Sequence, residues 1–227
     1  MQTTSDSSVT LASGGFLPRI WIFLFFFVSG ATGLIYEVVW TRLLTLVMGN
    51  THYSISTVLT AFMGGLALGS YVGGKVIDRK FNPLMAYAFL EAGIGLYCLF
   101  IPSLIDLAFP LFKLIYLNFG DSYTQASLAR FFVCVGILIL PATFMGATLP
   151  VLSKFVTHEE AHIGKDVGTL YSINTFGAVF GAWASAFIFM RLWGVQSTIW
   201  MAALLNLTIS VVIFLVFKPP LKEKDRN

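Results

Sequence analysis

The chain has 227 residues, of which 57% are hydrophobic and only 11% charged, and its mean hydropathy is +0.82. A soluble domain is about a quarter charged, so a water-soluble globule of this composition lacks the polar groups to cover its surface. The net charge of +3 is too small to favour nucleic acid as a partner. We therefore expect an all-α integral membrane protein whose partner is the lipid bilayer.

Six apolar segments are long enough to cross about 30 Å of hydrocarbon, which takes roughly 20 residues each. They lie near residues 20–40, 54–77, 84–104, 126–150, 168–190 and 195–217. The expected organisation is a disordered polar tail (1–16), a six-helix transmembrane domain (17–217) and a basic tail (218–227). Most Lys and Arg residues fall on the side of the two termini, so both ends are predicted to be cytoplasmic.

The stretch from Ser103 to Phe119 is apolar but contains Asp106, Pro110 and Lys113. We expect an interfacial helix or a bent extension here rather than a seventh span, because a seventh span would place the basic C-terminal tail outside.

Small residues recur every four positions on two predicted helices, and this spacing lets a neighbouring backbone approach closely. The two series are Gly65, Gly69 and Gly73 on the second helix, and Gly177, Gly181 and Ser185 on the fifth. These faces are predicted to pack within the bundle, or else to bind another membrane subunit or a second copy of the chain.

The fourth predicted helix contains Pro141 and Pro150, which indicate a kink or a partly unwound segment. The carbonyl groups that the prolines leave without donors need partners, for which Thr143 and Thr148 are the candidates.

Glu37, Glu91 and Arg130 fall inside the predicted spans and Arg42 just beyond the first, at depths where a charge is costly and needs a partner. Glu37 lies near the outer end of the first helix, and Arg42 or Arg130 at similar depth is its expected partner. Glu91 lies in the third helix, with Tyr171 and Asn174 as possible polar partners.

These intramembrane charges have two interpretations. They lock the helices in register, or one of the two carboxylates binds a small cationic ligand. No catalytic residue, metal-ligand set or cofactor site is predicted, since the two cysteines have no paired histidines near them in sequence.

Four stretches together carry a family resemblance: residues 29–50, 56–79, 140–156 and 164–187. They resemble, in order, the membrane half of bacterial fused major-facilitator/spermidine synthase-like proteins. The resemblance implies half of a major-facilitator bundle in the bacterial inner membrane. Within it Gly74, Asp78 and Arg79 resemble the short loop after the second helix of major facilitators, which braces the cytoplasmic side.

In the fused proteins a soluble synthase domain follows the helices, whereas no strand, glycine-rich turn and helix unit is found in this sequence. The resemblance therefore implies a separate soluble synthase-like chain as a partner, or a membrane part that works alone. We expect a non-catalytic membrane subunit or scaffold that docks partner proteins through its small-residue faces. The alternatives are a homodimeric transporter of a small solute such as a polyamine, or the membrane part of a split aminopropyltransferase-like enzyme.

Overall fold

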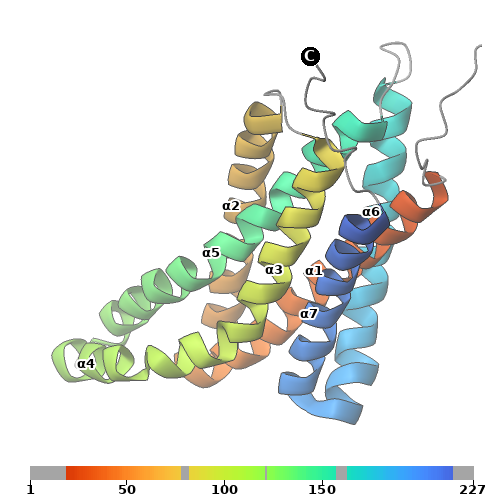
Figure 1. Cartoon of the computed structure of the whole chain (residues 1–227). Coiled ribbons are helices and arrows are strands. Elements are labelled where there is room, and N and C mark those ends of the chain that lie inside the picture. Colours follow the sequence, from red (N-terminus) through yellow and green to blue (C-terminus); the bar gives the residue numbers. More distant parts are fainter. Residues whose placement is uncertain (1–18, 78–81, 121, 157–162, 217–227) are drawn as a thin grey trace, which may run out of the picture.

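The computed structural model describes residues 19–77, 82–120, 122–156 and 163–216, and these residues are almost entirely helical (Figure 1). The helices in chain order are α1 (Arg19–Met48), α2 (Thr51–Ile77), α3 (Pro83–Leu107), α4 (Phe109–Phe119), α5 (Tyr123–Val156), α6 (Ile163–Ala184), the π-helix η2 (Ser185–Phe189) and α7 (Met190–Val216). The tails at 1–16 and 218–227 lie outside the described residues.

Five helical stretches of the described chain are long and apolar enough to cross a membrane, and the last of them, Ile163–Val216, contains 54 residues. A straight helix of that length would measure about 81 Å, well over twice the hydrocarbon thickness. The stretch instead turns at Gly194, which has φ 78° and ψ 175°. Figure 1 shows the chain reversing between α6 and α7, in keeping with the two separate segments that the sequence predicts at 168–190 and 195–217.

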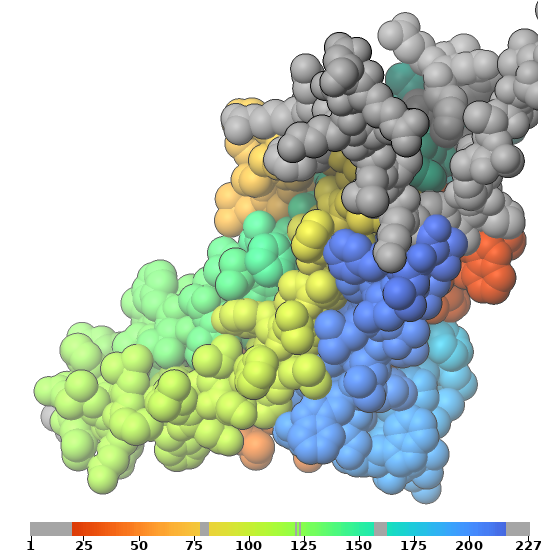
Figure 2. Space-filling model, viewed as in Figure 1, coloured from red at the N-terminus to blue at the C-terminus, as the bar shows by residue number. Residues whose placement is uncertain are grey.

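The apolar stretch between the third and fourth predicted spans divides between two elements. Its first residues complete α3, and the rest form α4, whose 11 residues make it too short to cross a membrane. Figure 2 shows α4 and the adjoining ends of α3 and α5 projecting away from α6 and α7. The expectation for this stretch was an interfacial helix or a bent extension rather than a seventh span, and α4 is too short for a seventh span.

The helices pack as two groups that share a centre. α5 packs between α2 and α3, while α1 contacts α6, α7 and α2. α3 lies against α7 and joins the two groups (Figure 1).

Glycines bring two of these helix pairs into backbone contact. A Cβ atom added at Gly65, Gly69 or Gly73 would lie less than 3.0 Å from atoms of α5, and one added at Gly177 or Gly181 would collide with carbonyl oxygens of α1. Ser185 is likewise fully buried. These glycines therefore lie where helices of this chain pack on one another. Helices of the same chain occupy both glycine faces.

α5 is one continuous helix despite Pro141 and Pro150. Proline has no N–H to donate to the carbonyl group four residues earlier, which leaves the oxygens of Ile137 and Gly146. The hydroxyl of Tyr97 on α3 donates to Ile137 O at 3.0 Å, and that of Ser70 on α2 donates to Gly146 O at 3.0 Å.

Neighbouring helices thus supply the donors that the sequence analysis assigned to threonines of α5. Thr143 and Thr148 instead donate to Ile139 O and Met145 O. At each proline, the carbonyl group left without its helical donor accepts a hydrogen bond from a neighbouring helix. Membrane bundles accommodate proline in this way.

These links predict a specific pattern of destabilisation. Ser70→Ala and Tyr97→Phe should each lower stability by about 1 kcal/mol, because each leaves a carbonyl group without a donor inside an apolar bundle. Thr143→Val is the control, since the Ile139 carbonyl that it bonds keeps its own helical N–H donor. Thermal unfolding in detergent measures all three, and an equal loss in the control would contradict the assignment.

Candidate functional site

A buried carboxyl group lies where α1, α3 and α7 meet. Glu91 on α3 is fully buried. The hydroxyl of Ser29 on α1 donates to its Oε1 at 2.6 Å, and the amide of Asn206 on α7 donates to its Oε2 at 2.5 Å. One side chain therefore ties three helices that are distant in sequence.

Two aromatic residues of α1, Tyr36 and Trp40, extend the network beyond Asn206. Tyr36 donates to Asn206 Oδ1 at 3.1 Å and stacks on Trp40 with ring centroids 5.7 Å apart. Asn206 is thus fixed from both ends of its amide group, with its donor facing Glu91 and its acceptor facing Tyr36. Both aromatic side chains are fully buried, so the network sits in the apolar centre of the bundle.

Neutral hydrogen-bond donors surround the Glu91 carboxyl group, and within the described residues no basic side chain forms an ion pair with it. A charge in hydrocarbon is expensive, and polar groups there face the bundle interior and pair with one another. The geometry fits a group that fixes helix register. A ligand would reach Glu91 only if the helices separated.

The predicted partners of Glu91 were wrong. Tyr171 is 61% exposed on the outside of α6. The Asn174 amide donates to Phe26 O on α1 at 3.1 Å. Both residues lie on α6, which packs on α1 and not against α3, so their similar depth does not bring them to Glu91.

The expected ion pairs of Glu37 were also wrong. Among the described residues neither Arg42 nor Arg130 approaches Glu37 as a salt-bridge partner. Arg42 is exposed, and Arg130 on α5 donates from Nη1 to Val47 O at 3.4 Å. Glu37 is partly buried, and no hydrogen bond to its carboxyl group occurs in the described part of the chain.

Ser29 and Asn206 are the functional candidates that the sequence analysis missed. Asn206 is a single amide in the apolar segment 199–216, and such a residue is a signal for a polar contact between helices. Ser29 carries no such signal, because serine also occurs in spans as a small packing residue.

Of the three residues of the loop motif after α2, the structure describes Gly74 alone. Gly74 lies in the last turn of α2, and a Cβ atom added there would meet nothing within 4 Å. Asp78 and Arg79 lie outside the described residues, so the predicted bracing role stays a prediction.

Comparisons with known proteins give one weak similarity. No family model matches the chain, and no solved structure does. The chain is 20% identical over 190 residues to the polyamine aminopropyltransferase of Oceanobacillus iheyensis. The similar region covers 84% of this chain but 34% of that protein, so the chain spans about a third of the length of its curated relative.

Proposed function

We propose that this chain is a non-catalytic, multi-pass subunit of a polyamine aminopropyltransferase-like system in a bacterial cytoplasmic membrane. The observation that carries the proposal is the extent of the similarity, which runs along most of this chain but only a third of the transferase. The described residues supply long apolar helices whose buried polar groups bond one another. In this proposal the catalytic unit is soluble and associates with these membrane helices.

The site of attachment has to be revised from the sequence expectation. The glycine faces are filled by α5 and α1, which leaves the end of the bundle where α2 and α5 finish and α3 and α6 begin. Lys75, Lys154 and Lys165 are exposed at this end. This basic end is the side that the positive-inside rule places in the cytoplasm, where a soluble transferase-like chain would dock.

Aminopropyl transfer to putrescine, measured in membrane and soluble fractions with and without this chain, tests the proposal. The purified chain should transfer nothing by itself, and deleting it should move activity from the membrane fraction to the soluble fraction. Transfer by the purified chain alone, or an unchanged distribution after deletion, would overturn the proposal.

The proposed topology has six crossings with both termini cytoplasmic. Single cysteines near His52, Gly120 and Gly194 should react with an impermeant thiol reagent from outside the cell, and those near Arg79, His162 and Asp225 should not. The native Cys98 and Cys134 are buried, so their removal gives a clean background. Labelling near Asp225 from outside would contradict six crossings.

Glu37 favours a second candidate, a homodimeric transporter of a polyamine-like cation, because its carboxyl group has no ion pair among the described residues. Glu37→Gln should fold normally or gain stability, since an unpaired carboxylate in an apolar bundle is costly. If Glu37 were ion-paired with an arginine, Glu37→Gln would instead lower the stability.

Thermal melts with and without spermidine separate the two candidates. For the subunit, neither the wild-type chain nor Glu37→Gln should respond to spermidine. A spermidine-dependent rise in melting temperature that Glu37→Gln abolishes would favour the transporter.

A further inference from the structure

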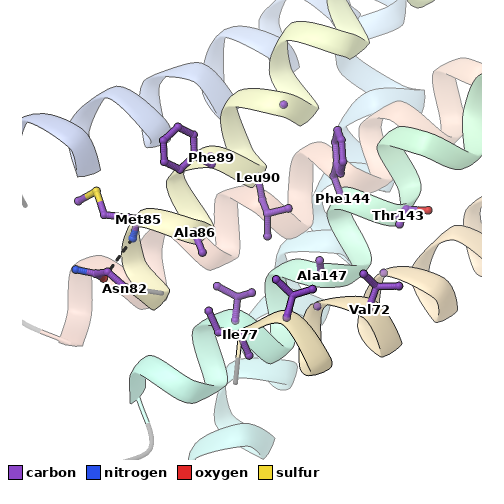
Figure 3. A pocket seen from close by; sticks show the side chains of 15 residues that line it. Val72, Ile77, Asn82, Met85, Ala86, Phe89, Leu90, Thr143, Phe144 and Ala147 are labelled. Carbon is purple, nitrogen blue, oxygen red and sulfur yellow. Dashed lines mark hydrogen bonds between the residues drawn. The ribbon is translucent and has the colours of Figure 1, made fainter. Parts of the chain in front are cut away.

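A groove opens on the outer surface of the bundle between α2 and α3, with α5 as its floor. Its volume is about 540 Å³, and its walls are apolar. Val72 of α2, Phe89 and Leu90 of α3 and Ala147 of α5 line it (Figure 3), together with Val76 of α2.

The groove has the depth of one membrane leaflet. Along α3 its lining runs from Asn82, at the start of the helix, to Gly93. Eleven helical steps measure about 17 Å, close to half of the roughly 30 Å hydrocarbon core. The Phe144 ring, 3.2 Å from the position of a Cβ atom on Gly93, lies at the deep end.

The size of the groove favours an acyl chain over a helix. A helix with side chains is about 10–12 Å wide, so 540 Å³ would accommodate only about 5–7 Å of its length. The rim residues Val72 and Phe89 are 48% and 66% exposed, so the groove opens sideways, toward the position of lipid. A single acyl chain is narrow and long enough to follow it.

The mouth of the groove is basic. Lys154 donates from Nζ to the carbonyl oxygen of Ile77, a lining residue, at 2.7 Å. Lys75, next to Val76, lies over the Tyr71 ring at 4.2 Å from its centroid. Both ammonium groups are at the end where α2 finishes and α3 begins, the level of a phospholipid headgroup.

We propose that this groove binds one anionic phospholipid, with an acyl chain between α2 and α3 and the headgroup phosphate beside Lys75 and Lys154. The membrane supplies such a ligand, because anionic lipids of the cytoplasmic leaflet are attracted to basic residues at the ends of membrane helices. Lys75 and Lys154 also lie at the end where a transferase-like chain is proposed to dock, but lipid binding requires no attached chain and is tested on this chain alone.

Native mass spectrometry of the full chain tests the site after delipidation and exposure to equal amounts of phosphatidylglycerol and phosphatidylcholine with identical acyl chains. The wild-type chain should retain one phosphatidylglycerol. Ala86→Trp, which fills the groove from α3, should lose it. Leu96→Trp is the control, because Leu96 is 52% exposed on the same helix but outside the groove.

Lys75→Gln keeps the test valid if the tryptophan variant does not fold. It should still retain a lipid but lose about fivefold of its preference for phosphatidylglycerol, the effect of about one kcal/mol per basic residue at the membrane surface. Equal retention by Ala86→Trp and wild type, or no preference in wild type, would overturn the proposal. So would a wild-type dimer that Ala86→Trp converts to monomer, because the groove would then be a protein interface.

Discussion

Gly69→Ala should unfold the bundle or lower its stability by about 3 kcal/mol, the upper end of the usual cost of overpacking. The added Cβ atom would lie well under 3.0 Å from the Thr143 carbonyl oxygen, closer than Cβ atoms come in real proteins. It would also lie under 3.0 Å from the backbone nitrogen of Ala147. Backbone atoms cannot rotate away as a side chain can, so α2 and α5 would have to separate. Gly177→Ala should behave alike, because its Cβ atom meets the Phe27 carbonyl oxygen.

The same helix offers matched controls. Added Cβ atoms at Gly64 and Gly74 meet nothing within 4 Å, and alanine is the better helix former. Gly64→Ala and Gly74→Ala should therefore be neutral or slightly stabilising. A thiol-reactive dye that reports the exposure of buried Cys98 and Cys134 on heating measures all four variants. Wild-type stability of Gly69→Ala would show that α2 does not lie on α5 in this way.

The sequence was sufficient to predict which segments are helices, because hydrophobic length is a property of the local chain. It also identified the glycine faces, since the four-residue spacing is visible without a structure. It did not identify what fills those faces. Helix order in a bundle depends on how distant segments pack, and α1–α6 and α2–α5 are pairings that no local pattern encodes.

The candidate site illustrates the same limit. The sequence identified Glu91 because a carboxyl group in an apolar span needs a partner, but the choice of Tyr171 and Asn174 assumed that α6 faces α3. The structure places α1 and α7 there instead. For a related reason, the sequence analysis named the wrong donors to the two carbonyl groups of α5 that the prolines leave without a helical N–H. Thr143 and Thr148 are near in sequence, whereas Ser70 and Tyr97 are near only in the folded bundle.

Glu91→Leu should lower stability by about 3 kcal/mol, because it leaves the Asn206 amide and the Ser29 hydroxyl without their acceptor in the centre of the bundle. Glu91→Gln should cost about 1 kcal/mol or less, since its oxygen can accept from Asn206 while its amide donates to Ser29. Glu91→Leu combined with Asn206→Leu should recover part of the loss, because the unpaired Asn206 amide is removed and only the Ser29 and Tyr36 hydroxyls are left without their acceptors. Thermal unfolding of Glu91→Leu, Asn206→Leu and the double variant gives the coupling between positions 91 and 206, expected to exceed about 1 kcal/mol for residues in one network. If Gln were as damaging as Leu, the negative charge itself would be needed, and Glu91 would have to face a cation that the register role does not include.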